Sequence, residues 1–116
     1  EHTIDDKLRV VTEAVYGRSV IVIDDSVVSG TNIKNAVIKL KMAGAKEIHL
    51  RIASPPYLHP CYWGVDTPSV DRFIAYQRDI YQIQKTLGVD SISYLSMEGM
   101  LKHVFRPYDK CTKCFR

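Results

Sequence analysis

Four consecutive β-branched residues, VIVI at positions 20–23, run directly into the polar sequence DDSVVSGTN, and this junction constrains the fold more than any other part of the chain. A continuous apolar run of this length predicts a strand that is buried on both faces, as in a parallel sheet. The apolar residues that follow have helical spacing up to Gly44. These residues are Ile33, Ala36, Val37 and Leu40. Residues 46–53 then alternate between apolar and polar, so strand, loop, helix and strand together predict a βαβ unit.

Less regular segments flank this unit. A short helix is expected before it, ending near Tyr16. After it, residues 54–64 contain three prolines and a glycine, which exclude regular structure. Thr67 as an N-cap, with Pro68 at the first helical position, then predicts a helix that extends to about Gln77.

The last third of the chain predicts three further elements. A helix over residues 80–87 ends at Gly88, and residues 91–95 form a short strand. Ser96 can cap a last helix that reaches roughly Phe105. The fold class expected from these elements is α/β, a single domain with a Rossmann-like βαβ core, a parallel sheet and a helical C-terminal part.

The composition is that of one ordinary globular domain. The chain has 116 residues, of which 46% are hydrophobic and 25% charged, and this excludes collagen-like, low-complexity and disordered chains. No apolar run approaches the roughly 20 residues of a membrane-spanning helix. Residues 1–15 lack the basic start and apolar middle of a signal peptide. The sequence therefore predicts a cytoplasmic chain without membrane contacts.

The positive charge is concentrated at one end of the chain. The formal net charge is +3, and residues 101–116 alone contain five basic residues and one acid. A nucleic-acid-binding surface needs a broad basic face, whereas this excess surrounds two cysteines. We therefore expect no nucleic-acid partner.

The loop after the first strand has the residue types of a phosphate-binding site. Gly30 allows backbone amides to approach an anion closely, and the N-terminus of the following helix adds partial positive charge. Further donors come from the side chains of Ser29, Thr31 and Asn32. The loop lacks the lysine of a Walker motif and the GxGxxG of a dinucleotide fold, so neither ATP hydrolysis nor NAD binding is supported.

Two adjacent acids begin the same loop. Asp24 and Asp25 would repel a phosphate placed on them, but they suit vicinal hydroxyls or a hydrated magnesium ion. A ligand with a ribose diol, a terminal phosphate and a metal-bound pyrophosphate fits both halves of the loop. The spacing alone is equally consistent with an acidic loop that only caps the following helix.

Four segments resemble one enzyme family. VIVIDDSVVSGTN at 20–32 closely resembles the PRPP-binding signature of type I phosphoribosyltransferases. RIASPPYLHPCYWGVDTPS at 51–69, DSISYLSMEGM at 90–100 and CTKCF at 111–115 are similar to the C-terminal part of one of their families, the glutamine phosphoribosylpyrophosphate amidotransferases. The resemblance extends over nearly the whole chain.

This resemblance implies a reaction and a set of binding residues. The family transfers ammonia from glutamine to C1 of PRPP, releases pyrophosphate and forms 5-phosphoribosylamine in the first step of purine biosynthesis. Asp24 and Asp25 would hold the ribose hydroxyls and Mg²⁺. The 5′-phosphate would be bound by Ser29, Gly30, Thr31 and Asn32. Positioning and electrostatics would carry catalysis, since the transition state is a sugar cation.

The chain departs from the family pattern at three positions. The family usually has arginine where Ser29 stands and threonine where Asn32 stands. Both residues still donate hydrogen bonds, but a positive charge beside the phosphate is lost. Val70 replaces a common arginine, and the sequence gives no consequence for this change.

The three cysteines predict a metal centre only loosely. Cys111 and Cys114 form a CxxC pair, and Cys61 lies on the proline-rich loop. This arrangement suits a metal or cluster, a redox pair or three free thiols. Zinc completed by His59 or His103 is a further alternative.

The resemblance narrows these alternatives. In the family members that carry a [4Fe–4S] cluster, the loop cysteine and the CxxC pair are ligands, which implies Cys61, Cys111 and Cys114 here. The fourth ligand lies upstream of the signature and is absent from this sequence. Lys110 and Lys113 would favour thiolates at the pair.

The same resemblance implies that residues 1–116 are the C-terminal portion of a phosphoribosyltransferase domain. The glutaminase domain, whose nucleophile is an N-terminal cysteine, is absent, and the portion alone is expected to be inactive. Its expected partners are PRPP, purine nucleotides, the rest of the same enzyme and further copies of itself. Two other functions stay open, a non-catalytic PRPP-sensing module and a small iron–sulfur or zinc-binding domain.

Overall fold

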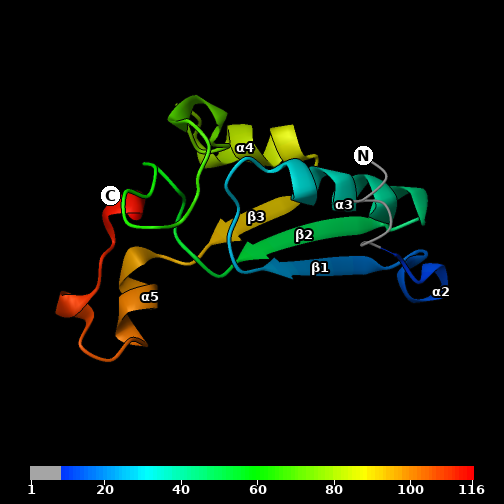
Figure 1. Ribbon diagram of the computed structural model, residues 1–116. Coiled ribbons are helices and arrows are strands. Elements are labelled where there is room, and N and C mark those ends of the chain that lie inside the picture. The colour runs from blue at the N-terminus through cyan, green and yellow to red at the C-terminus, as the bar shows by residue number, and fades with distance from the viewer. Residues whose placement is uncertain (1–8) are drawn as a thin grey trace.

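Three parallel strands form the sheet that positions the candidate loop. The computed structural model describes residues 9–116. The strands are β1 (Ser19–Asp24), β2 (Glu47–Ile52) and β3 (Ser91–Tyr94), and they lie in the order β1-β2-β3. Helices α3 (Thr31–Met42) and α4 (Ile80–Leu87) lie on the same face of the sheet (Figure 1). The predicted α/β class and βαβ unit are confirmed.

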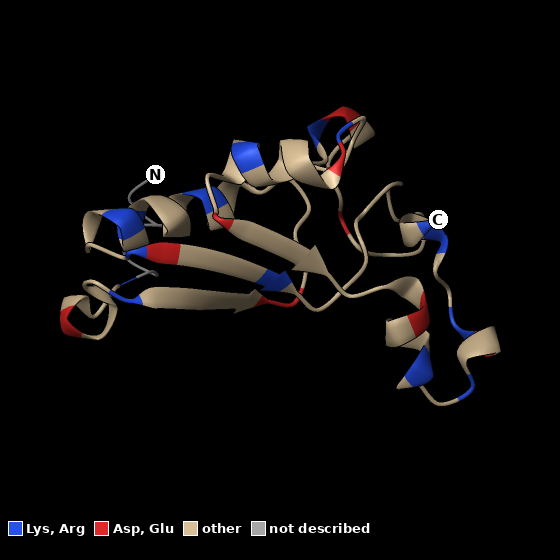
Figure 2. Ribbon diagram, turned by 180° about the vertical axis from the view of Figure 1, so that it is seen from behind, with Lys and Arg blue, Asp and Glu red and all other residues tan. Residues whose placement is uncertain are grey.

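The register brings the ends of the strands to one edge. Asp24 lies opposite Ile52, and Ile52 lies opposite Tyr94. The segments that leave the three strands therefore start side by side, and Figure 2 shows the acidic residues at the end of β1 on this edge. In α/β sheets, ligands bind at the carboxyl ends of the strands.

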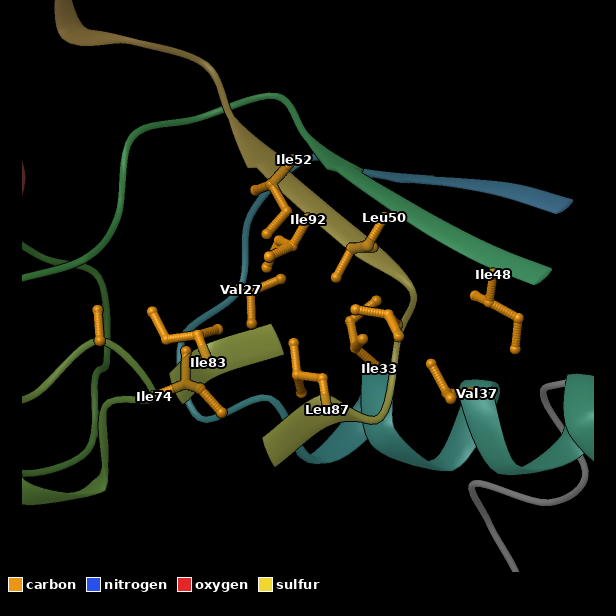
Figure 3. Packing of buried hydrophobic residues seen from close by; sticks show 12 residues of the cluster. Val27, Ile33, Val37, Ile48, Leu50, Ile52, Ile74, Ile83, Leu87 and Ile92 are labelled. Carbon is orange, nitrogen blue, oxygen red and sulfur yellow. The ribbon is translucent and has the colours of Figure 1, made fainter. Parts of the chain in front are cut away.

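The core lies between the sheet and the two helices (Figure 3). Ile48, Leu50 and Ile52 alternate along β2 and are at most 3% exposed, as the alternation predicted. The cluster that they join comprises Val27, Ile33, Val37, Ile74, Ala75, Ile83, Leu87, Val89 and Ile92. Its members come from the loop after β1 as well as from the helices, so the loop is anchored in the core.

The prediction that both faces of the first strand are buried is wrong for the described residues. Ile21 is 66% exposed and Ile23 is 76% exposed, whereas Val22 packs against the core. β1 is an edge strand, and α3 and α4 cover only the face that Val22 shares.

The predicted helix from Thr67 to Gln77 is also wrong. Only a single 3₁₀ turn, Val70–Arg72, forms there, and the Thr67 hydroxyl accepts a hydrogen bond from the amide of Cys61 at 3.2 Å. Residues 73–75 are all buried, which a one-sided helix cannot achieve because consecutive helical residues point in different directions.

The remaining elements follow the sequence more closely. α2 (Thr12–Val15) ends at its C-cap Tyr16 as expected, and any part of that helix before residue 9 lies outside the described residues. α5 (Met97–Lys102) is capped by Ser96, whose hydroxyl accepts from the amide of Gly99 at 2.9 Å. It ends three residues before the expected Phe105. Two more 3₁₀ turns, Pro107–Asp109 and Lys113–Phe115, complete the chain. Within residues 9–116, no helix has the length and apolar character needed to cross a membrane.

A capping box begins α4. The Asp79 carboxylate accepts from the amide of Gln82 at 2.8 Å, and the Gln82 side chain accepts from the amide of Asp79 at 2.9 Å. Asp79→Ala removes one half of this exchange and is expected to lower the free energy of unfolding by about 1 kcal/mol. Urea unfolding measures the loss, and Asp66→Ala, at an exposed loop position, is the control. Equal stability of the two variants would contradict the role of the cap.

Candidate functional site

A hollow of about 310 Å³ lies at the end of β1. It is lined entirely by consecutive residues, from Asp24 at the end of β1, through the connection to α3, to Ile33 in the first turn of that helix. The structure thus brings all six residues predicted for this loop around one space. We call residues 24–33 the β1–α3 loop.

The acidic end of the β1–α3 loop combines one half-buried and one exposed carboxylate. Asp24 accepts a hydrogen bond from the amide of Asp25 at 2.8 Å, and Ser26 donates to Asp25 at 3.3 Å. Burial raises the pKa of Asp24, and the neighbouring Asp25 carboxyl raises it further, against the lowering effect of the backbone amides. A cation or sugar hydroxyls at this point would satisfy the oxygens that face the hollow.

The opposite end of the loop presents hydrogen-bond donors. The hydroxyls of Ser29 and Thr31 are 3.2 Å apart, and the Ser29 oxygen also accepts weakly from the amide of Thr31 at 3.4 Å. Within the described part of the chain, the amides of Asn32 and Ile33 have no acceptor. Free amides in the first turn of a 12-residue helix attract anions, and the helix dipole adds to this effect.

Gly30 makes this geometry possible. Its φ is +83°, a left-handed conformation that is unfavourable for other residues. A Cβ atom there would lie 3.0 Å from Ile74 and 3.1 Å from Leu87. The amide of Ile74 also donates to the carbonyl of Val28 at 2.8 Å. Sequence reasoning missed Ile74 and Leu87 as supports of the loop, because the helix predicted over 67–77 gave residue 74 a different environment.

The cysteines gather near one another without forming a finished metal site. Cys61 and Cys114 are half-buried, Cys111 is exposed, and all three are free. The carbonyl of Cys114 accepts hydrogen bonds from the amides of Leu58 and His59, at 2.8 and 3.1 Å. The 3₁₀ turn Lys113–Phe115, which we call the C-terminal turn, therefore lies against the segment that leads to Cys61.

The environments of two of these thiols differ. Hydrogen bonds from the backbone amides of Trp63 and Val65 lower the pKa of Cys61. Burial raises the pKa of Cys114, and the charges of Cys61 and Cys111 raise it further. In residues 9–116, however, no three His, Cys, Asp or Glu side chains come close enough together to hold a metal ion. The three cysteines therefore do not fit a cluster in this arrangement.

The three aromatic residues of the proline-rich loop differ in burial and in ring packing. Tyr57 packs against Phe73, with ring centroids 6.3 Å apart, and against Phe115 at 5.1 Å. Tyr62 and Trp63 are 68% and 77% exposed and do not join this packing. Tyr62 instead lies beside the C-terminal segment, with the Lys113 ammonium 5.6 Å from its ring centroid, so only Tyr57 among the three aromatic residues of the loop packs against other rings.

The sequence is similar to named enzymes over almost its full length. It is 40% identical over 120 residues to the amidophosphoribosyltransferase of Bacillus subtilis, a match that covers 99% of this chain and 25% of the relative. The amidophosphoribosyltransferase of Archaeoglobus fulgidus is 44% identical over 114 residues, which cover 98% of this chain and 25% of the relative. The chain is homologous to one part of the amidophosphoribosyltransferases. Comparison with models of protein families finds no match.

The fold agrees with this relationship. The structure of glutamine phosphoribosylpyrophosphate amidotransferase from B. subtilis, complexed with ADP and GMP, matches with a TM-score of 0.82 at 37% identity. The match covers 99% of this chain and 27% of that chain. The α/β fold with a type I phosphoribosyltransferase-like core is thereby confirmed. The chain spans about a quarter of the length of these amidophosphoribosyltransferase relatives.

Proposed function

We propose that this chain supplies the ribose-phosphate half of the PRPP site of an amidophosphoribosyltransferase. The observation that carries the proposal is the single hollow lined by residues 24–33, in which two carboxylates face one end and free helix amides the other. The homology to amidophosphoribosyltransferases supports the same assignment. The similar B. subtilis structure is, by its printed name, that of a PRPP amidotransferase.

Each end of the hollow has a proposed task. Asp24 and Asp25 hold the ribose hydroxyls and Mg²⁺, which when bound neutralises charge on the pyrophosphate. The 5′-phosphate is bound by the donors Ser29, Gly30, Thr31 and Asn32. Ammonia then attacks C1, the bond from C1 to the pyrophosphate oxygen breaks with its electron pair going to pyrophosphate, and the new ammonium group loses its extra proton to solvent. The carboxylates stabilise the positive charge that develops on the sugar, and no proton transfer from these residues is required.

Other parts of such an enzyme complete the site. Segments outside residues 1–116 would bind the pyrophosphate. They would also release ammonia from glutamine. The B. subtilis structure contains ADP and GMP, and we propose purine nucleotides as ligands of this protein also. Assembly into a homo-oligomer and a cytoplasmic location stay predictions.

For the cysteines we propose a [4Fe–4S] cluster in the complete protein, with Cys61, Cys111 and Cys114 as ligands. The hydrogen bonds between the C-terminal turn and residues 58–59 support the proposal because they bring the two cysteine segments together. The turn would have to rearrange, since the three sulfurs do not form a ligand set as they stand. Iron and sulfide analysis after anaerobic purification tests this assignment, and a preparation free of both would refute it.

Calorimetric titration of the intact protein with PRPP tests the function. Binding is expected to strengthen when Mg²⁺ is present and to be competed by ribose 5-phosphate, and pyrophosphate release with ammonia reports the reaction. Absence of binding with Mg²⁺ present would refute the proposal. Binding without any turnover would favour a PRPP-sensing module.

The serine in the loop offers a gain-of-affinity prediction. Ser29 is exposed and stands where the family usually has arginine, beside the proposed phosphate position. Ser29→Arg adds a charge-assisted, two-pronged hydrogen bond and is expected to tighten ribose 5-phosphate binding about tenfold. Ser69→Arg, on an exposed segment outside the hollow, is the control for added charge. An unchanged dissociation constant for Ser29→Arg would place the phosphate elsewhere.

A further inference from the structure

Tyr57 is the aromatic residue of the proline-rich loop that faces inward. It is half-buried between Phe73, which is fully buried, and Phe115 of the C-terminal turn. The two ring contacts come from segments 42 residues apart in the sequence. Tyr57 therefore joins the C-terminal turn to the segment around Phe73.

The segment around Phe73 also holds the β1–α3 loop. Ile74, next to Phe73, donates its amide to the carbonyl of Val28, and its side chain lies against Gly30. Phe73 and Ile74 are neighbours along the chain. A shift of Phe73 therefore moves the amide of Ile74, which donates to the carbonyl of Val28. The ring of Tyr57 is one contact away from this support.

The backbone beside Tyr57 is fixed from the other direction. The amides of Leu58 and His59 donate to the carbonyl of Cys114, and the His59 ring lies 3.1 Å from the carbonyl of Arg116. Figure 1 shows the C-terminal end beside the loop that follows β2. Residues 58 and 59 are thus hydrogen-bonded to the C-terminal turn, and Tyr57 beside them contacts Phe73, the neighbour of Ile74.

The phenol group of Tyr57 lies near the acidic end of the loop as well. Burial raises the pKa of Tyr57, and the charges of Cys114, Cys61 and Asp25 raise it further, whereas hydrogen bonding with Ser26 lowers it. The side chain therefore interacts electrostatically with both the cysteine-bearing turn and the start of the loop.

We propose that Tyr57 is a positioning residue for the β1–α3 loop, through which the C-terminal turn supports Phe73, Ile74 and the backbone of Val28. The inference rests on the proposed function for the identity of its ligand. It assigns Tyr57 no contact with the reacting atoms.

Two readouts test the inference in the intact protein. The first is hydrogen exchange at the Ile74 amide without ligand, and the second is the dissociation constant for PRPP with Mg²⁺. Tyr57→Ala is expected to accelerate the exchange and weaken the affinity, each about fivefold. Tyr57→Phe loses the hydroxyl that interacts with Ser26 but keeps both ring contacts, so it is expected to restore the exchange rate and the affinity to within about twofold. The matched control is Trp63→Ala, since Trp63 lies on the same loop and its side chain is 77% exposed.

The outcomes separate this inference from the proposed function. If Tyr57→Ala leaves the exchange at Ile74 unchanged, or if Trp63→Ala has an equal effect, the positioning role is overturned. If the parent protein does not bind PRPP, the proposed function fails, and the exchange data alone decide the role of Tyr57. A loss of affinity that Tyr57→Phe does not restore would also overturn the assignment to the ring.

Discussion

Asp25→Asn is expected to weaken the binding of PRPP with Mg²⁺ roughly 100-fold, because the neutral amide removes one of the two charges that face the cation and the ribose hydroxyls. Asparagine has nearly the same shape as aspartate, and its side-chain oxygen can still accept the 3.3 Å hydrogen bond from Ser26. The loop geometry should therefore persist while its charge changes. Calorimetric titration of parent and variant measures the loss.

The same variant is expected to be at least as stable as the parent. The pKa of Asp24 is raised by burial and by its Asp25 neighbour, so the folded state binds a proton at Asp24 more tightly than the unfolded state does. The stabilisation linked to this group is complete below the unfolded pKa and is lost as the pH rises through the higher folded value. Asp25→Asn removes one cause of the raised pKa, so the variant loses less stability over that interval.

Weaker PRPP binding by a variant that is at least as stable as the parent would exclude unfolding as the cause of the lost binding. Asp66→Asn is the control for removal of an exposed carboxylate outside the hollow. Equal affinity of Asp25→Asn and the parent would refute the role given to Asp25. A loss of affinity accompanied by a lower melting temperature would instead indicate that Asp25 supports the loop structurally.

The elements that local patterns specify were predicted well. α4 coincides with residues 80–87 because a capping residue and a glycine in the left-handed conformation mark its two ends. β2 follows from strict alternation, and α3 follows from its apolar stripe. In each case the signal lies within the element itself.

The errors arose where tertiary packing decides. The sequence of β1 reads as fully buried, but burial of Ile21 and Ile23 requires a layer that residues 9–116 do not supply. The start at Thr67 has the residues of a helix, yet Phe73 and Ile74 are buried in a turn, in which the amide of Tyr76 donates to the carbonyl of Phe73 at 3.0 Å. Such long-range contacts leave no local signal.

For the candidate site, too, the residues that line the hollow were predictable from local sequence, whereas the residues that support it were not. Its lining was predictable, because it consists of consecutive residues at the end of a strand. Its supports were not, because Tyr57, Ile74 and Leu87 lie far from the loop in sequence. The resemblance predicts the three cysteines as one ligand set, and this stays a prediction, because their mutual placement depends on the C-terminal turn.

Gly30→Ala is expected to lower the free energy of unfolding by about 2–3 kcal/mol and to weaken ribose 5-phosphate binding at least about tenfold. Two costs add: the left-handed φ of +83° disfavours any Cβ, and this Cβ would press on Ile74 at 3.0 Å and Leu87 at 3.1 Å. Relief of that contact moves the loop away from the core. The amides of Asn32 and Ile33 then turn away from the phosphate.

Gly17→Ala separates the two costs. Gly17 has a similar φ of +70°, but a Cβ there meets nothing within 4 Å. This control is therefore expected to lose only about 1 kcal/mol, the cost of the backbone conformation, and to bind ribose 5-phosphate normally. Urea unfolding and calorimetry compare both variants with the parent. If the two variants lose equal stability, crowding against Ile74 and Leu87 contributes nothing. If Gly30→Ala binds normally despite its lower stability, the loop does not hold the phosphate through the backbone geometry that Gly30 provides.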